Sequence, residues 1–325
     1  MSAAIKLSSP ATREFWEIPV LFEDAHLLAL DKPAGLLASP DRCDASRPSL
    51  MKLLLEGIAA GKPWALERGL AWLSLAHRLD FETSGVILLA KNKATLVALA
   101  DLFGSEKPLR KYVALAWGDP PAKHFEVDAK LAPHPVKPGQ MRVDPREGRK
   151  SRTEFEVLEQ FSGWTLLRCS PLTDRAHQIR VHLRHAGFPV VADELYGGKK
   201  LWLSRLKKDF RLKPGREERP LISRTALHAE ELSLPHPVTN EPVTLRREWP
   251  KNLCVAWKYL RQYAKGSCGL TGCRGALFSQ PTLHPLSFPP IFCLLESGGN
   301  ALENGRQKSK RLDRLKANRL ESPMK

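Results

Sequence analysis

Short apolar runs separated by turn residues recur through the first 260 residues, and this pattern limits the fold more than any other feature. Runs of this length, alternating or wholly apolar, are typical of β-strands when Gly, Pro, Asp or Asn bounds them. We expect a hairpin of two strands within residues 20–33. Single strands are expected at residues 85–91, 111–117, 153–158 and 164–169.

Three segments have apolar residues at helical spacing instead. They are residues 49–60, residues 93–103, and a segment from about residue 176 to residue 186 that Thr173 would cap and Gly187 would end. Hairpins mixed with separate helices, without a repeating βαβ unit, predict an α+β fold. Its central sheet should be mixed and mainly antiparallel.

Composition indicates a globular protein, and the types of residue in the chain change near Tyr263. Hydrophobic residues make up 42% of the chain, and no apolar run reaches the roughly 18 residues of a membrane span. The N-terminus lacks a secretory signal pattern, and the six cysteines are scattered without a CxxC pair, which favours a reduced, cytoplasmic protein. All eight Trp and four Tyr lie at or before Tyr263. We therefore expect an N-terminal extension over residues 1–19, a domain over residues 20–263 and a disordered basic tail over residues 264–325.

The net charge of +16 points to an anionic partner, which for a cytosolic chain is most commonly a nucleic acid. Two loop-like insertions carry much of the basic charge. Residues 133–152 contain four Pro and six Lys or Arg, and residues 197–220 contain nine Lys or Arg against three Asp or Glu. Such runs can be solvated surface, but their concentration on so basic a chain favours contact with phosphates.

Asp80 is the first candidate for chemistry, because it lies in a polar loop, AHRLDFETSG, directly before an expected strand. One interpretation is a turn former, since Asp, Thr and Ser readily bond their own backbone. The other is a carboxylate held at a sheet edge beside cationic side chains, where it can act as nucleophile or base.

The expected helix near residue 180 is the second candidate. Helical spacing places His177, Arg180 and Arg184 on one face, either as an exposed basic surface or to present Arg180 to a carboxylate and a phosphate. His177, His182 and His185 lack a carboxylate at matching spacing, so we expect no metal site. In a third block, LRKYVAL, Tyr112 is either a half-buried strand aromatic or a flat surface on which a base can stack.

Five blocks in one order, across roughly residues 20–250, resemble the RluA-type RNA pseudouridine synthases. They are LDKPAGL, HRLDFETSGVILLAK, RKYVALAWG, RAHQIRVHLRHAG with the following ADELYGG, and ALHAEELSLPHP. The resemblance implies a mainly antiparallel sheet with flanking helices and loops around a catalytic cleft. It also implies isomerisation of uridines in structured ribosomal or transfer RNA by a cytoplasmic monomer, with no cofactor, no membrane and no obligatory protein partner.

The resemblance also implies roles for single residues. Asp80 matches the catalytic aspartate, and Arg180 matches the basic residue that pairs with it. Tyr112 matches the aromatic that stacks on the target uracil and is a candidate for removing the proton from carbon 5. Leu227 matches an apolar wall of the pocket, and we assign Arg78 to substrate binding. All five residues are therefore expected around one catalytic cleft.

The sequence departs from the family pattern at Asp174 and Ala176, where Gly and a hydroxyl residue are common. Asp174 adds a negative charge near Arg175, and this charge could alter substrate binding. Some family members carry a small RNA-binding domain ahead of the catalytic one, and the nineteen residues before the first expected strand are too few to form it. Two alternatives stay open: a catalytically silent RNA-binding factor, and a hydrolase that uses His77 and Asp80 as acid and base.

Overall fold

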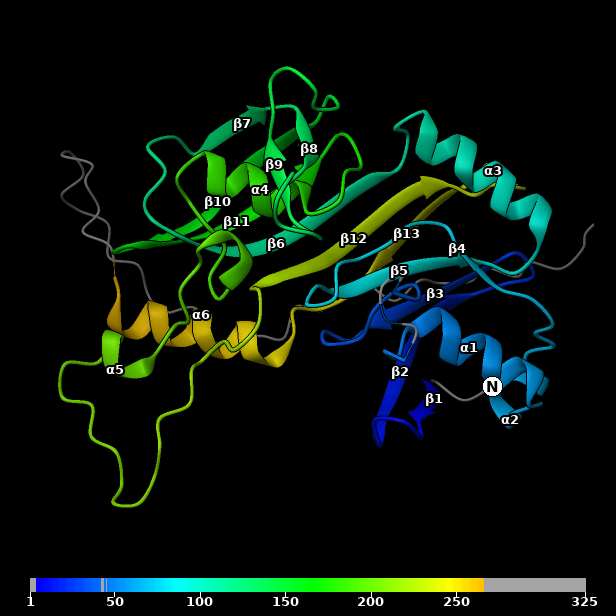
Figure 1. Cartoon of the computed structure of the whole chain (residues 1–325), viewed down its shortest axis with the longest axis horizontal. Coiled ribbons are helices and arrows are strands. Elements are labelled where there is room, and N and C mark those ends of the chain that lie inside the picture. The colour runs from blue at the N-terminus through cyan, green and yellow to red at the C-terminus, as the bar shows by residue number, and fades with distance from the viewer. Residues whose placement is uncertain (1–3, 42–43, 45, 266–325) are drawn as a thin grey trace, which may run out of the picture. The chain divides into compact units, whose positions relative to one another are not determined.

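A large mixed sheet forms the framework of the computed structural model, which describes residues 4–41, 44 and 46–265 (Figure 1). The sheet has 11 strands, nine of them in the order β1-β2-β3-β5-β12-β6-β11-β10-β7, with β13 paired to β12 and β4 paired to β5. The strands are β1 (Ala4–Ser9), β2 (Glu14–Glu23), β3 (Leu27–Lys32), β4 (Ser74–Leu75), β5 (Ser84–Ala90), β6 (Leu109–Trp117), β7 (His124–Asp128), β10 (Arg152–Phe161), β11 (Trp164–Pro171), β12 (Leu227–Pro235) and β13 (Pro242–Arg246).

The pairing between β5 and β12 is parallel, and every other pairing in this sheet is antiparallel. The predicted mixed, mainly antiparallel sheet is therefore confirmed. Because parallel neighbours begin at the same edge of a sheet, the loop before β5 and the first residues of β12 are brought together. β6 pairs with the other edge of β12, with Tyr112 opposite Ala229.

Helices and a small hairpin surround this sheet. They are α1 (Leu50–Ala59), α2 (Pro63–Leu66), α3 (Lys93–Gly104), α4 (Gln178–His185), the 3-10 helix η1 (Glu194–Tyr196), α5 (Leu203–Leu206), α6 (Lys251–Tyr263) and the separate pair β8 (Leu131–Pro133) and β9 (Met141–Val143). Among the described residues, no helix is both long and apolar enough to cross a lipid bilayer.

The apolar run of β5 is buried on both sides, which explains why it reads as continuous rather than alternating. Ile87 and Leu89 pack with α1 and the N-terminal strands. Val86 and Leu88 pack instead with Leu99 of α3 and with β12 and β13. The strand that follows the Asp80 loop is thus fixed from both faces, and so is the position from which that loop leaves the sheet.

Most elements lie where the sequence predicts them. The hairpin of residues 20–33 is β2 and β3, and the single strands are β5, β6, β10 and β11. Ser49 caps α1, its side chain accepting a hydrogen bond from the Lys52 main chain. Residues 1–19 were expected to form an extension outside the domain. In the part of this segment that the structure describes, β1 pairs with residues 14–19 of β2 and so belongs to the sheet. The expected tail lies outside the described residues from residue 266 onward.

The predicted start of the helix near residue 176 is wrong. α4 begins at Gln178, and its N-cap is His177 in the left-handed conformation, which a helix cannot continue backwards through. The hydroxyl of Thr173, the expected cap, donates instead to the side-chain oxygen of Gln178 at 2.7 Å. Gly187 has φ +90° directly after α4 and ends it as predicted.

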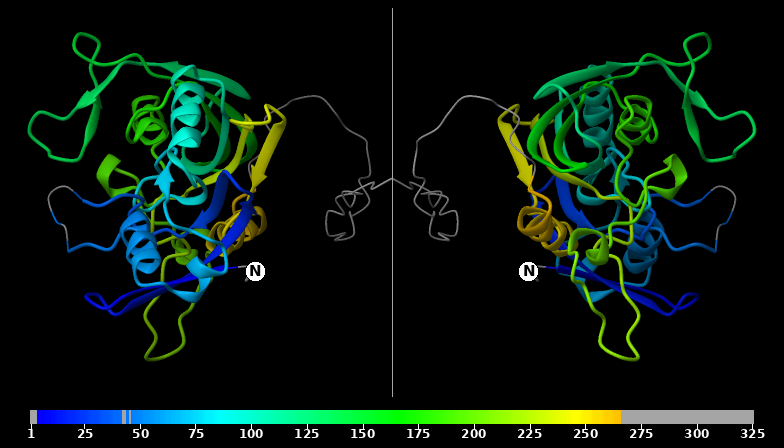
Figure 2. Two further views of the ribbon diagram at one scale, coloured as in Figure 1. Left: turned by 90° about the vertical axis from the view of Figure 1, so that its right-hand side faces the viewer. Right: turned by 90° about the vertical axis from the view of Figure 1, so that its left-hand side faces the viewer.

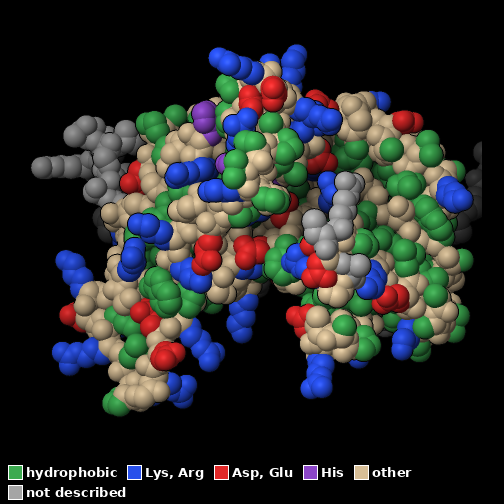
Figure 3. Space-filling model, viewed as in Figure 1, with side chains coloured by type: hydrophobic (Ala, Val, Ile, Leu, Met, Phe, Trp, Pro, Cys, Tyr) green, Lys and Arg blue, Asp and Glu red, His purple; other side chains and the backbone are tan. Residues whose placement is uncertain are grey.

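The two basic insertions extend away from the sheet in each view (Figures 1 and 2). The first was expected to be a loop, but it starts at the last residue of β8 and contains β9, and these strands pair as a hairpin from Leu131 opposite Val143 to Pro133 opposite Met141. The second contains the short helix α5 and then a long loop. Lys and Arg side chains gather on that loop at the lower left of the molecule (Figure 3).

Candidate active site

Asp80 lies in the tight loop between β4 and β5. The backbone N–H of Thr83 donates to the Asp80 carbonyl at 3.1 Å, which closes the turn. The N–H of Gly35 donates to the carbonyl of Phe81 at 2.9 Å and ties the loop to the segment after β3. Since the backbone of Asp80 makes the turn, its carboxylate is left for contacts outside the loop.

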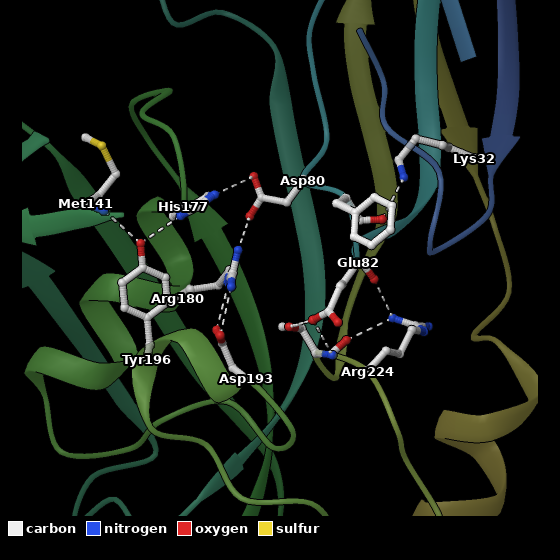
Figure 4. Close-up of polar contacts among 11 residues, drawn as sticks. Lys32, Asp80, Glu82, Met141, His177, Arg180, Asp193, Tyr196 and Arg224 are labelled. Atoms are coloured by element: carbon white, nitrogen blue, oxygen red, sulfur yellow. Dashed lines mark hydrogen bonds and ion pairs between the residues drawn. The ribbon is translucent and has the colours of Figure 1, made fainter. Parts of the chain in front are cut away.

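Arg180 of α4 bridges two carboxylates (Figure 4). Its NH1 donates to Oδ2 of Asp80 at 3.0 Å, while Nε and NH2 donate to the two oxygens of Asp193 at 2.7 and 2.8 Å. Burial alone would lower the pKa of Arg180, but the carboxylates of Asp193 and Asp80 outweigh it and raise that pKa. The expected pairing of Arg180 with Asp80 is present, and Asp193 is a partner that the sequence did not indicate.

His177 and Tyr196 complete this polar cluster. His177 Nε2 lies 3.9 Å from Oδ1 of Asp80, and its Nδ1 lies 2.7 Å from the hydroxyl of Tyr196. The ring of Tyr196 lies under the guanidinium of Arg180, with 5.0 Å between the guanidinium carbon and the ring centroid. Sequence reasoning named His177 as a neighbour of Arg180 on the helix but gave Tyr196 no role.

The five residues expected around a cleft line one pocket, which encloses about 410 Å³ including space open to solvent. They are Arg78, Asp80, Tyr112, Arg180 and Leu227. They come from the Asp80 loop, β6, α4 and the start of β12, so the chain brings together residues nearly 150 positions apart. Cationic, carboxylate, aromatic and apolar groups therefore converge on a single concave site, which is the usual character of a ligand pocket.

Tyr112 presents its ring to this pocket from the half-buried side of β6. No side chain or backbone group among the described residues hydrogen-bonds to its hydroxyl. Burial raises the pKa of that hydroxyl above its ordinary value. The phenol consequently stays protonated at neutral pH, and its ring face is the part best suited to contact a ligand.

A set of partly buried contacts holds the Asp80 loop against the segment before β12, and sequence reasoning did not identify it. Arg224 NH1 donates to the carbonyls of Glu82 and Leu227 at 3.0 and 3.2 Å. The Glu82 carboxylate accepts hydrogen bonds from the backbone N–H of Thr225, at 3.0 Å, and from the Thr225 hydroxyl. These contacts join the loop that carries Asp80 to the segment that carries Leu227 (Figure 4).

Gly85 is required where β5 meets β12. Its φ is +116°, and a Cβ atom at this position would lie 2.1 Å from the carbonyl oxygen of Ala229. The close approach that brings the Asp80 loop beside Leu227 is therefore possible only with glycine.

His77 and His182, two of the histidines considered as acid–base groups or metal ligands, have structural partners. His77 Nε2 accepts a hydrogen bond from the Leu88 N–H at 3.1 Å, and burial lowers the pKa of His77 to about 4. His77 does not line the pocket, which removes the basis for a His77–Asp80 hydrolase. His182 contacts Thr153 and the carbonyl of Ala129. Within the described part of the chain, no group of three or more His, Cys, Asp or Glu could hold a metal ion.

Asp174, one of the two departures from the family pattern, lines the same pocket. Its carboxylate was expected to act near Arg175, but it forms an ion pair with Arg110 at 3.2 Å. The Arg175 guanidinium donates to the carbonyls of Lys150 and Asp174, at 3.2 and 3.4 Å, and not to the Asp174 carboxylate. Asp174 therefore pairs with Arg110, the residue of β6 two positions before Tyr112, and both Asp174 and Tyr112 line the pocket.

Comparison with known proteins gives one consistent result. The family model described as RNA pseudouridylate synthase matches residues 26–185. Ribosomal large subunit pseudouridine synthase C of Escherichia coli K12 is 34% identical over 244 residues, covering 74% of this chain and 70% of that protein. Dual-specificity RNA pseudouridine synthase RluA of the same strain is 31% identical over 236 residues, covering 72% and 94%. The structure of human RNA Pseudouridylate Synthase Domain Containing 4 matches with a TM-score of 0.58 and 25% identity, covering 74% of this chain and 92% of that one.

Proposed function

The chain belongs to the RluA-type RNA pseudouridine synthases and is an isomerase of this family, and from this premise we propose that it converts specific uridines in structured ribosomal or transfer RNA to pseudouridine, with Asp80 as the reacting carboxylate. The observation that supports this assignment most directly is the ion pair between Asp80 and Arg180 at the wall of an open pocket. Arg180 orients the carboxylate and balances its charge, while the other oxygen of Asp80 stays outside this ion pair.

The reaction sets clear requirements for such a site. The glycosidic bond between carbon 1′ of the ribose and N1 of uracil breaks, the base rotates, and carbon 5 bonds to carbon 1′. Carbon 5 loses its proton and N1 gains one, so the product is an isomer and no redox cofactor is consumed. Asp80 can serve either by attacking the sugar or by removing a proton from the ribose, and both routes need an ionised carboxylate beside the nucleoside.

The remaining residues suit the handling of a base that has left its stack. Tyr112 offers a ring on which uracil can stack, and Leu227 offers an apolar wall beside it. Arg78 supplies a cation at the pocket mouth for the neighbouring RNA backbone. Loops and bulges of folded RNA provide uridines that can reach such a pocket.

The proposed partner is therefore RNA alone. We take the enzyme to act as a cytoplasmic monomer without an obligatory protein partner, the two basic insertions supplying contacts to phosphates. The relatives named above act, by their names, on ribosomal large-subunit RNA or on RNA with dual specificity. The choice between ribosomal and transfer RNA for this chain is left to the experiment below.

Release of tritium from carbon 5 of uracil tests the proposal. Bulk ribosomal and transfer RNA, labelled at carbon 5, would be taken from cells that lack this gene and incubated with the wild-type enzyme or with Asp80→Asn. We expect release by the wild type alone, because Asn keeps the size of Asp80 but cannot act as nucleophile or base. RNA affinity should stay within about twofold of wild type, since phosphate contacts dominate binding.

Two results would contradict the proposal. Full activity of Asp80→Asn would remove the aspartate from the mechanism. RNA binding without tritium release from either pool would instead identify a catalytically silent RNA-binding factor that keeps the fold. The RNA pool that releases tritium identifies the substrate class.

A further inference from the structure

The backbone of His177, the N-cap residue of α4, has an unusual conformation. Its φ of 55° and ψ of 17° lie in the left-handed region, which a residue with a Cβ atom seldom adopts. Its side chain does not cap α4, as an N-cap side chain usually does. The ring lines the same pocket as Asp80 instead. Disfavoured backbone that is retained beside a pocket is a reason to ask what the side chain does there.

Tyr196 fixes the chemical form of the His177 ring. The backbone N–H of Met141 donates to the Tyr196 hydroxyl oxygen at 2.9 Å, so the hydroxyl proton is free to go to Nδ1 of His177, 2.7 Å away. Burial also lowers the pKa of His177 and keeps the ring neutral, although Asp80 acts in the opposite direction. A neutral ring that accepts at Nδ1 must carry its proton on Nε2.

That Nε2–H lies beside the one oxygen of Asp80 that Arg180 does not hold. Arg180 donates to Oδ2 at 3.0 Å, whereas Oδ1 lies 3.9 Å from His177 Nε2. This separation is too long for a hydrogen bond. Contacts of this kind often tighten when substrate closes the site. The two donors approach different oxygens, so together they would fix the rotation of the carboxylate.

We propose that His177 is a positioning residue for Asp80, held by Tyr196 as the neutral tautomer that donates from Nε2 to Oδ1 when uridine occupies the pocket. The inference rests on the proposed function, because it gives His177 a task in the reaction of Asp80. Tyr196 also lies under Arg180, so one ring supports both donors. Met141 belongs to the β8–β9 hairpin, which connects that basic insertion to the carboxylate through the same hydroxyl.

Kinetics of His177→Gly in the tritium-release assay give the first test. Glycine suits the left-handed backbone, so this variant removes the ring without adding strain. We expect kcat to fall about 10–100-fold, the usual cost of losing a group that orients a reacting residue. The KM for RNA should change little, because the ring acts through Asp80. The control is His185→Ala, on the exposed end of the same helix, which should match wild type.

Rescue separates positioning from a structural role. Imidazole added to His177→Gly should restore part of kcat and should not affect Asp80→Asn. A wild-type kcat in His177→Gly would overturn the proposal. So would a lowered kcat that imidazole leaves unchanged, because that result assigns the ring a structural role.

A second measurement does not depend on activity, so it still decides the inference if the wild type releases no tritium and the proposed function fails. NMR of full-length protein with ¹⁵N-labelled histidine reports which ring nitrogen carries the proton. We expect His177 to be neutral with its proton on Nε2, and we expect Tyr196→Phe to shift the ring toward a mixture of tautomers. A proton on Nδ1 in the wild type would overturn the proposal.

Discussion

The geometry of Asp80 depends on a residue that does not line the pocket. Asp193 is fully buried and receives two of the three hydrogen bonds that Arg180 makes to carboxylates. A bidentate pair of this kind fixes the plane of the guanidinium and leaves only NH1 free for Asp80. Two carboxylates facing one buried guanidinium also mean that the cluster keeps a net negative charge. The RNA backbone is itself negatively charged and cannot offset the charge of this cluster. The surrounding cations must therefore do so when RNA binds.

Tyr112→Phe tests whether the hydroxyl or the ring of Tyr112 matters. Phe keeps the ring on which uracil would stack, so RNA affinity should stay close to wild type. Because burial raises the pKa of Tyr112, the hydroxyl is a poor base at neutral pH, and we expect kcat to fall less than about tenfold. Filter binding and tritium release measure the two effects separately. A large loss of affinity in Tyr112→Phe would place the ring away from the bound base.

Lys32 supplies a prediction about stability and pH. Its side chain is fully buried and donates to the carbonyls of Pro33, Leu36 and Phe81. Burial lowers the pKa of Lys32 from 10.5 to about 7, although Asp80 partly opposes this. Between these two values the unfolded chain binds a proton that the folded chain has released. Stability relative to Lys32→Met should therefore rise as pH increases from 7 to 10.5.

Urea unfolding of both proteins at pH 7, 8, 9 and 10, roughly spanning that window, measures this difference. Lys32→Met serves as the reference because it keeps the length of the side chain and has no titratable group. Parallel dependence of the two unfolding free energies on pH would show that Lys32 keeps an ordinary pKa in the folded chain.

At the scale of elements, the site depends on two neighbouring strands that begin at the same edge of the sheet. The parallel pairing of Gly85 with Ala229 places the Asp80 loop beside Leu227, and the close backbone approach there excludes any side chain at Gly85. Arg224 and Glu82 then join the two segments by hydrogen bonds across this junction. A change in either segment would therefore be transmitted to the carboxylate of Asp80.

Glu82→Gln tests this junction. The neutral amide weakens the hydrogen bonds from Thr225 and removes the charge that faces Arg224, so we expect a loss of about 1–3 kcal/mol in the free energy of unfolding. We also expect a lower kcat, because the Asp80 loop is less firmly held. The matched control is Glu126→Gln, which removes one charge of an exposed ion pair with Arg152 and should change the free energy of unfolding much less, because solvent screens that pair. Equal effects of the two variants would contradict a special role for Glu82.

Local patterns in the sequence predict elements more reliably than they predict this site. Ser49 and the buried run of β5 carry their own signals, and the first strand also alternates, with Ile5 and Leu7 buried. The left-handed backbone of His177 has no sequence signal, so the cap at Thr173 was misplaced.

Contacts between distant segments were the hardest to predict. The positions of Asp80 and Arg180 followed from the family resemblance. Asp193, the second partner of Arg180, and Glu82, which contacts Thr225 and faces Arg224, lie in the same quoted blocks, but no spacing rule relates Asp193 to Arg180 or Glu82 to Arg224. Such pairs depend on how the chain reverses after α4 and on which strands become neighbours in the sheet. Neither is fixed by a local pattern.

For the whole molecule, the distribution of charge matters more than its total. Asp80, Arg180 and Asp193 together carry a net negative charge, whereas the loop after α5 and the β8–β9 hairpin carry basic residues away from the sheet (Figures 1 and 3). This arrangement would hold RNA by its backbone at the insertions and leave the pocket to select the base. Binding should therefore weaken steeply with salt, because each phosphate contact releases counterions.

The loop after α5 allows this arrangement to be tested with a change of four charges. Lys207, Lys208, Arg211 and Lys213 are all exposed there. Replacing them by Ala should reduce the slope of log affinity against log salt by roughly three, if each contacts a phosphate. The control replaces four exposed lysines elsewhere, Lys6, Lys62, Lys93 and Lys107, and removes the same charge. A net-charge effect would change both slopes equally, whereas direct contact changes only the first. If the first variant kept the wild-type slope, the loop would be a solvated surface and RNA capture would rest on other parts of the chain.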